Sequence, residues 1–183
     1  LDFKDKFGYA DATLPLKASG NIVTGNALRL DWKQVCPTVD AQGNKREVYI
    51  CGNPPFLGTT ERSKEQLEDM KHVFAEFKSL GYLDLVSAWF WKAAKYLQGN
   101  NARSGLVSTN SICQGDQTSL LWPPIFELGV SIDFCYRTFY WSNSAKDNAA
   151  VHVVVVGLKN SNDTSSRPRI FAVSKDRVLS SEV

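Results

Sequence analysis

The residues with the clearest chemical meaning are Asn53-Pro54-Pro55-Phe56, which come one glycine after the apolar segment 47–51. Proline has no N–H and a fixed φ, so two successive prolines make a stiff turn whose carbonyl oxygens stay free as acceptors beside the amide of Asn53. In an α/β sheet, ligands bind just beyond the carboxyl ends of strands, which is where these residues would project. The pattern predicts an array of hydrogen-bond acceptors next to an aromatic ring.

Such an array suits methyl transfer to an exocyclic amino group of a nucleobase. The lone pair of that nitrogen is delocalised into the ring, and two acceptors directed at its N–H groups can draw it toward a tetrahedral shape. The side-chain oxygen of Asn53 and the carbonyl of Pro54 would stabilise the positive charge that develops during in-line attack. Phe56 would stack on the base, which must leave the duplex to be reached. An ordinary Pro-Pro loop at a strand end is the alternative interpretation.

Other catalytic patterns are absent from the sequence. None of the 12 glycines stand in GxG spacing, and there is no GxxxxGK[ST] segment, so the chain has neither a glycine-rich cofactor loop nor a P-loop. The two histidines, His72 and His152, have no serine elbow or HExxH around them. The four cysteines are widely spaced and include no CxxC pair. We therefore expect no metal site and no hydrolytic triad.

The composition is that of one globular domain or a part of one. The 183 residues are 43% hydrophobic and 22% charged, which excludes disordered and collagen-like classes. A net charge of +2 does not indicate a basic nucleic-acid coat, and the longest apolar run, 149–158, is too short to span a bilayer. Three of the four cysteines lie in or beside apolar stretches, and no secretory signal pattern is present. We expect buried, reduced thiols and a cytoplasmic protein that contacts no membrane.

From residue 21 onward, short apolar segments alternate with polar or helical ones, which predicts an α/β fold. The last two apolar segments are joined by a polar stretch, as in a hairpin-like antiparallel pair. The expected strands are NIVT (21–24), EVYIC (47–51), SGLVST (104–109), VSIDFCY (130–136) and AVHVVVVG (150–157).

Two helices are expected between the second and third strands. Ser63 begins helix 63–80 at capping-box spacing from a glutamine, and the second helix spans 84–97. A third helix should start near Gln117, and Pro123-Pro124 should kink or end it.

Residues 53–56 resemble, as NPPF, the catalytic motif Asn/Asp/Ser-Pro-Pro-Tyr/Phe/Trp of the adenosylmethionine-dependent amino-methyltransferases of DNA. This short motif also occurs in ribosomal-RNA and protein-glutamine methyltransferases. Longer blocks resemble the methylase domain of large single-chain restriction-modification enzymes, which methylate adenine at N6. These blocks are NIVTGNALRLDW at 21–32, YICGNPPFLG at 49–58, LDLVSAWFWKAAKYL at 83–97, GLVSTNSICQGDQ at 105–117 and RTFYWSNSAKDNAAVHVVVVGL at 137–158.

The resemblance implies an incomplete Rossmann-like methyltransferase sheet, mostly parallel with one antiparallel strand and with helices on both faces. It also implies methyl transfer from S-adenosylmethionine to N6 of an adenine flipped out of double-stranded DNA. Target-recognition and nuclease domains would belong to the same polypeptide. Competing functions are a methyltransferase of RNA or protein glutamine, and a non-catalytic module that binds nucleic acid by stacking on Phe56, Phe139 and Trp141.

Carried over by position, the resemblance makes Asn53, Pro54, Pro55 and Phe56 catalytic. Two further residues are candidates for cofactor binding. Asn26 matches the position that contacts the adenine end of adenosylmethionine, where the family often has Asp, and Asp31 is the second candidate.

The same resemblance implies five substrate-binding candidates. Phe139 matches the loop that supplies a second stacking ring, with Trp141 as its alternative, and Asn110, Ser111 and Gln114 would line the base or DNA channel. The competing interpretations are a hydrophobic loop that closes the sheet and ordinary loop polarity.

The family's adenosylmethionine loop and ribose-binding acidic residue would lie upstream of this sequence. We therefore expect the C-terminal part of a catalytic domain, inactive alone, with an irregular approach at 1–20, the partial catalytic domain at 21–158 and a linker leaving it at 159–183. Family topology separates strand 21–24 from strand 47–51 by two strands, which leaves strand edges unpaired. We expect the isolated chain to re-pair its strands, dimerise through an edge, or shed its N-terminus.

Overall fold

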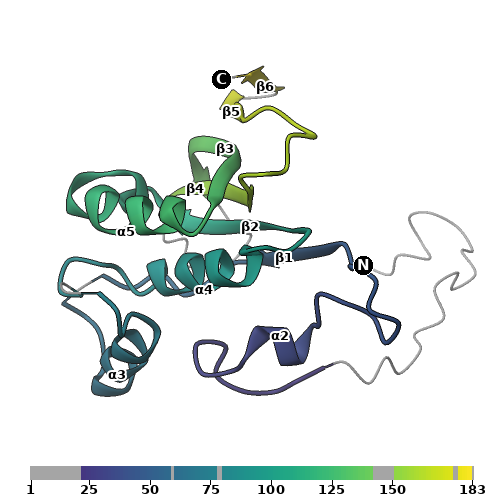
Figure 1. The fold of residues 1–183 in the computed structure, drawn as a ribbon. Coiled ribbons are helices and arrows are strands. Elements are labelled where there is room, and N and C mark those ends of the chain that lie inside the picture. Colours follow the sequence, from purple (N-terminus) through teal and green to yellow (C-terminus); the bar gives the residue numbers. More distant parts are fainter. Residues whose placement is uncertain (1–21, 59, 78–79, 142–150, 175–176, 183) are drawn as a thin grey trace, which may run out of the picture.

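The computed structural model describes residues 22–58, 60–77, 80–141, 151–174 and 177–182 (Figure 1). Its helices are α2 (Trp32–Val35), α3 (Lys64–Val73), α4 (Ser87–Leu97), the short 3-10 helix η1 (Asn110–Cys113) and α5 (Gly115–Glu127). Its strands are β1 (Val48–Gly52), β2 (Ala102–Thr109), β3 (Val130–Trp141), β4 (Val151–Asn160), β5 (Arg169–Ser174) and β6 (Arg177–Glu182).

The described strands form one sheet in the order β1-β2-β4-β3-β5-β6. β1 and β2 are parallel, and β4 is antiparallel to both of its neighbours, β2 and β3. β1, β2 and β3 therefore run in one direction, with β4 reversed between them. The predicted α/β class, with a largely parallel sheet and an inserted antiparallel strand, is confirmed.

The helices α4 and α5 contact each other and pack on the sheet (Figure 1). Phe90 of α4 meets Trp122 of α5 edge to face, with ring centroids 5.8 Å apart. Alternate residues of β2 are buried, as expected for a strand with one face against helices. The largest fully buried side chains of this core include Phe90, Leu97, Leu106, Leu121, Ile125 and Leu158.

The start of α3 is as predicted, but its end is not. Ser63 Oγ accepts from the amide of Gln66, and Gln66 Oε1 accepts from the amide of Ser63, which is the expected capping box. The helix ends at Val73 instead of continuing to residue 80. Phe77 packs edge to face against both Phe74 and Trp91, each at 4.8 Å. Aromatic packing onto α4 thus accompanies the departure of the chain from helical geometry.

The two prolines of the third helix do not end it, which was one of their two expected effects. α5 runs from Gly115 to Glu127 and contains Pro123 and Pro124 in its last two turns. The prolines remove two backbone donors, yet buried Leu121, Trp122 and Ile125 anchor the helix around them. The helix ends just before Gly129, whose positive φ of 73° suits a glycine after a helix C-terminus.

The predicted strand at 21–24 is not present in its described part. Residues 22–24 have no regular secondary structure, and Ile22 and Val23 are 91% and 50% exposed. β-branched residues favour strands only where a neighbouring strand can pair with them. β1 pairs only with β2 and is an edge strand of the described sheet, as the family topology implied.

The segment 159–183, predicted to be a linker, returns to the sheet. β5 pairs in parallel with β3, with Arg169 opposite Phe134, and then forms an antiparallel pair with β6. Phe171 stacks on Tyr136 at 4.7 Å. Residues 161–168, between β4 and β5, lie outside helices and strands, but their polar composition does not reveal what they contact.

A buried ionic network fastens this segment to the sheet. Asp133 and Lys159 are only 4% and 3% exposed, and their charged atoms lie 3.6 Å apart. Ser166 binds both, because its hydroxyl donates to Asp133 Oδ1 (2.7 Å) and its carbonyl accepts from Lys159 Nζ (2.5 Å). Arg103 bridges Asp133 (3.3 Å) and Asp163 (2.6 Å). Hydrogen bonds from Ser165 and the ion pair with Arg103 lower the pKa of Asp163 to about 2.

The thiols are free as expected but not buried as expected. Cys36, Cys51 and Cys113 are exposed, and Cys135 is half-buried. Neighbouring apolar residues in the sequence did not predict burial, because alternate residues of a strand point to opposite faces and a loop residue need not follow its neighbours inward.

Replacing Asp133 by alanine should destabilise the fold, because Lys159 would keep a buried charge without a carboxylate partner. We expect a loss of about 3–5 kcal/mol in the free energy of unfolding, measured by urea denaturation. Glu68→Ala, which breaks an exposed ion pair with Lys71, is the control and should change stability by less than about 1 kcal/mol. Equal effects of the two variants would contradict this assignment.

Candidate active site

The Asn53–Phe56 loop emerges at the carboxyl end of β1, where a parallel neighbour also ends. Gly52, the last residue of β1, is opposite Leu106 of β2, and β2 leads into η1 three residues later. Val153 of β4 is opposite Thr109 of β2 on one side and Phe139 of β3 on the other. The sheet register therefore brings the loop after β1, the turn after β2 and the end of β3 to one edge.

The loop carries hydrogen-bond acceptors that meet no donor among the described residues. Asn53 and Pro55 are exposed, Pro54 is buried, and Phe56 is half-buried against the core. Within the described residues, no hydrogen bond is made by the side chain of Asn53 or by the carbonyl of Pro54. The carbonyl of Leu57, just after the motif, accepts from the amide of Leu85 at 3.1 Å and so holds the loop to the chain entering α4.

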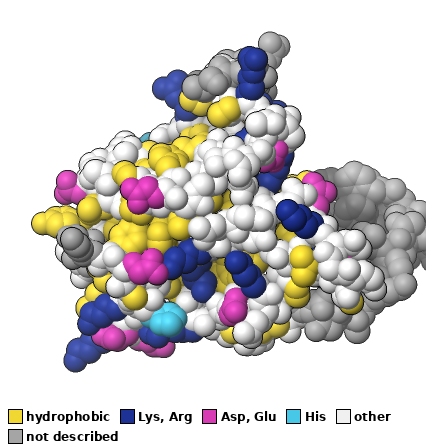
Figure 2. Space-filling model, in the orientation of Figure 1, with side chains coloured by type: hydrophobic (Ala, Val, Ile, Leu, Met, Phe, Trp, Pro, Cys, Tyr) yellow, Lys and Arg dark blue, Asp and Glu magenta, His cyan; other side chains and the backbone are white. Residues whose placement is uncertain are grey.

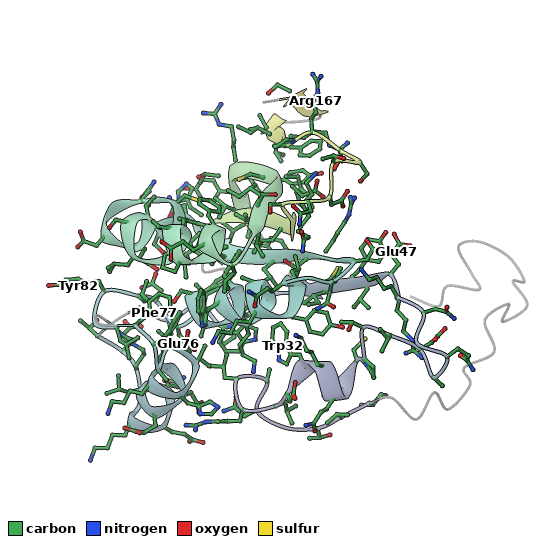
Figure 3. All side chains as sticks on the ribbon, viewed as in Figure 1. Trp32, Glu47, Glu76, Phe77, Tyr82 and Arg167 are labelled. Carbon is green, nitrogen blue, oxygen red and sulfur yellow. The ribbon has the colours of Figure 1, made fainter. Side chains whose placement is uncertain are left out.

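A pocket of about 490 Å³ adjoins this loop. Asn53, Pro54 and Pro55 form part of its wall together with β1. The remaining wall is mainly apolar and aromatic and comes from the segment 27–36, from α4 and from one residue of β2: Ala27, Leu30, Trp32, Val35, Cys36, Trp89, Tyr96 and Leu106. Figure 3 shows Trp32 between α2 and α4, on the side of α2 that faces α4.

Polar contacts from α4 hold the segment 27–36 in place. Lys92 Nζ donates to the carbonyls of Leu28 (3.3 Å) and Leu30 (2.8 Å) and lies 5.4 Å from the ring centre of Trp32. Burial lowers the pKa of Lys92. The hydroxyl of Tyr96 donates to the carbonyl of Cys36 (2.6 Å), and burial together with this bond raises the pKa of Tyr96 to about 12. The spacing of Trp89 and Tyr96, seven residues apart on one helix, was the signal that could have revealed this wall.

The two predicted cofactor residues do not line this pocket. Asn26 donates to Asp69 Oδ2 (2.7 Å) and accepts from the amide of Leu28 (2.9 Å), so both ends of its side chain are engaged. Burial raises the pKa of Asp69, but hydrogen bonds from Arg29 and Asn26 outweigh it and hold the pKa below its usual value. Asp31 caps α2 by accepting from the amide of Lys33 (2.9 Å).

The predicted stacking residues lie in a strand, not in a loop. Phe139 and Trp141 lie at the C-terminal end of β3. Their ring centres are 6.2 Å apart, and Trp141 is 41% exposed. Tyr140, between them in sequence, pairs with His152 instead, at 4.2 Å between rings. The alternation of a strand therefore puts Phe139 and Trp141 together on one face.

The polar candidates after β2 divide between solvent and a hydrogen-bond network. Asn110 and Ser111 lie in η1 and are half-buried, whereas Gln114 is exposed. Ser111 Oγ donates to Asp84 Oδ2 (2.6 Å), which also accepts from Gln117 Nε2 (2.8 Å). Sequence reasoning missed Asp84 and Gln117, which are polar residues beside expected helix starts and carry no motif of their own.

Charged side chains of both signs lie on the face of the molecule that Figure 2 shows. On the face shown in Figure 2, basic and acidic side chains are interspersed and form no continuous basic surface there. No group of three or more potential metal ligands occurs in the described residues. Among those residues, no helix is long and apolar enough to cross a membrane.

The chain matches the family model described as the DNA-methyltransferase domain of MmeI over residues 1–172. It is 49% identical over 145 residues to a protein called DNA methyltransferase A from Bacillus subtilis (strain 168). The aligned region covers 79% of this chain and 16% of that protein.

Two solved structures extend the comparison. The Type IIL restriction-modification enzyme MmeI in complex with DNA matches with a TM-score of 0.81 and 40% identity, over 98% of this chain and 23% of that one. A type I restriction-modification methyltransferase subunit from Streptococcus thermophilus shares the fold, with a TM-score of 0.50 and 18% identity over 84% of this chain and 32% of that one.

The chain thus spans less than a quarter of the length of the Bacillus protein and of MmeI. The resemblance to the methylase domain of large single-chain restriction-modification enzymes is confirmed. Since the family model matches nearly the entire sequence, the chain belongs to the MmeI DNA-methyltransferase domain family.

Proposed function

We propose that the intact protein containing this chain is a DNA methyltransferase that transfers a methyl group from S-adenosylmethionine to N6 of an adenine flipped out of the duplex. The observation that carries this proposal is the Asn53–Phe56 loop at the carboxyl end of β1, with free acceptors on Asn53 and Pro54 beside a pocket. The match to MmeI, whose structure was solved in complex with DNA, supports DNA as the acceptor.

The proposed role of the loop follows from its acceptors. Asn53 Oδ1 and the carbonyl of Pro54 accept the two N–H groups of the adenine amino nitrogen and direct its lone pair at the methyl group. As the nitrogen attacks, it gains positive charge, which these two oxygens stabilise from fixed positions. Pro54 and Pro55 restrict the direction of the Pro54 carbonyl, since the ring fixes φ and the following proline limits ψ. Phe56 stacks on the base.

S-adenosylmethionine supplies an electrophilic methyl group, and the pocket suits one part of this molecule. The rings of Trp32, Trp89 and Tyr96 offer an aromatic wall for a purine next to Asn53. No charged side chain lines the pocket in the described residues, so its lining offers no partner for the charged amino-acid end of the donor. This fits our expectation that a glycine loop and a ribose-binding acid come from another part of the polypeptide.

The base and DNA contacts are assigned to the same edge of the sheet. Phe139 provides the second stacking ring, with Trp141 beside it, while Asn110, Ser111 and Gln114 border the path of the extruded base. Asn26 and Asp31 retain an indirect role in cofactor binding, because they shape the segment that carries Trp32. Target-recognition and nuclease domains of the same polypeptide would select the site, and the enzyme would work on DNA in the cytoplasm.

Asn53→Ala in the intact protein should abolish methyl transfer while sparing DNA binding. Loss of one preorganised charge-stabilising group lowers kcat by about 100-fold or more. Asn162→Ala, an exposed asparagine beyond the opposite end of β4, is the matched control and should leave kcat unchanged. Methyl incorporation from labelled S-adenosylmethionine into DNA, RNA and glutamine-containing peptides measures the activity and its acceptor. Transfer to RNA or peptide alone, or full activity of Asn53→Ala, would sink the proposal.

Trp32→Ala should weaken donor binding, because it removes one wall of the pocket. A lost aromatic stacking partner costs about 1–3 kcal/mol, or about 5- to 150-fold in Kd. Calorimetric titration of the intact protein with S-adenosylmethionine measures this change. Trp32→Phe should restore most of the affinity, and Trp141→Ala, outside the pocket, should leave it unaltered. An unchanged Kd for Trp32→Ala would remove this pocket from the donor site.

A further inference from the structure

Asp84 lies where three segments of the candidate site meet. It precedes α4, and its Oδ2 atom accepts from Ser111 Oγ (2.6 Å) in η1 and from Gln117 Nε2 (2.8 Å) in α5. Ser111 Oγ is also 2.7 Å from Thr109 Oγ1, at the end of β2. One carboxylate oxygen therefore joins the turn that follows β2 to the first turn of α5.

The backbone around Asp84 extends the connection to the catalytic loop. Gln117 Oε1 accepts from the amide of Asp84 (3.1 Å), so Gln117 hydrogen-bonds both the backbone and the side chain of this residue. The next amide, of Leu85, donates to the carbonyl of Leu57 (3.1 Å), which directly follows Phe56. Because Gln117 is buried, with 7% exposed, its amide has little access to alternative water partners.

The carboxylate suits this task better than a neutral side chain would. Two donors converge on one oxygen, and charge-assisted hydrogen bonds are shorter and stronger than neutral ones. The carboxylate also stands before the N-terminus of α4, where the helix dipole favours negative charge. The backbone carbonyl of Asp84 accepts from both the amide and the hydroxyl of Ser87, which fixes the backbone at this point.

We propose that Asp84 is a positioning residue that sets the Asn53–Phe56 loop against the turn bearing Asn110 and Ser111. This proposal rests on the proposed function, in which the loop holds the amino group and the turn borders the extruded base. Asp84 touches neither substrate nor cofactor in this role. It acts through Leu85 and Leu57 on one side and through Ser111 on the other.

The first test uses Asp84→Leu, Asp84→Asn and, as a control, Asp116→Leu, an exposed aspartate in α5. In the intact protein, Asp84→Leu should lower kcat about 10- to 100-fold, because a misplaced reacting group loses about that much, with KM for DNA and donor changed less than about 3-fold. Asp84→Asn should recover most of the rate, since its amide oxygen can still accept from Ser111 and Gln117. Asp116→Leu should match wild type.

Gln117→Met provides a second route if Asp84→Leu folds poorly, because it keeps the side-chain volume and removes both bonds between Gln117 and Asp84. Its effect on kcat should not add to that of Asp84→Leu, as for two members of one network. Wild-type kcat in folded Asp84→Leu and Gln117→Met would overturn the proposal. So would a loss that Asp84→Asn does not recover.

Hydrogen exchange separates this proposal from the proposed function. In Asp84→Leu, the amides of residues 84 and 85, which donate to Gln117 Oε1 and to the carbonyl of Leu57, should exchange faster than in wild type, whether or not the protein transfers methyl groups, while those of β4 should not. A wild-type protein that methylates no acceptor would refute the function alone. Unchanged exchange at residue 85, whose amide contacts the loop through Leu57, would refute the positioning role alone.

Discussion

The parallel pairing of β1 with β2 is the constraint on which the candidate site depends. Parallel neighbours end at the same edge of a sheet, so the chain that leaves Gly52 and the chain that leaves Thr109 emerge together. The pairing also requires a crossover, and α4 provides it. The crossover begins at this edge, where Leu85 bonds Leu57, and returns at the opposite edge, where Val48 bonds the carbonyl of Asn101. The Asn53–Phe56 loop is thus held by the chain entering a helix that the topology requires.

The antiparallel strand β4 adds a third element to the same edge. Its residues 153–158 are mostly buried and lie between β2 and β3. Val153 is opposite Thr109 of β2 on one side and opposite Phe139 of β3 on the other. The ring of Phe134 in β3 packs directly on the backbone of β4 at Gly157. A Cβ at that position would lie 2.2 Å from the ring. Insertion of this apolar strand carries the aromatic end of β3 to the edge where the Asn53–Phe56 loop and η1 lie.

Two of the networks formed by buried and half-buried polar groups lie near opposite edges of the sheet and have different partners. Asp84 joins loops at the carboxyl edge of the parallel strands, whereas Asp133, Lys159 and Arg103 fasten the segment 161–166 near the opposite edge. Each network satisfies its charges internally, which is the condition under which charged groups remain stable away from water. The Asp84 network connects segments at the edge of the sheet that carries the candidate site. The Asp133 network holds the segment that leads to β5.

The sequence by itself determined the class of the sheet, four of its strands, the capped start of α3 and the loop at 53–56, because these depend on local rules: alternation, capping and proline geometry. It left the strand at 21–24, the end of α3 and the C-terminal strands wrong and did not show that α5 continues past Pro123-Pro124, because each depends on a partner distant in sequence. Only the tertiary structure decided that Asn26 bonds Asp69, that Trp32 and Trp89 share a pocket, and that Asp84, before α4, bonds both η1 and α5. Contacts of this kind span tens of residues, and no local pattern of residue types encodes them.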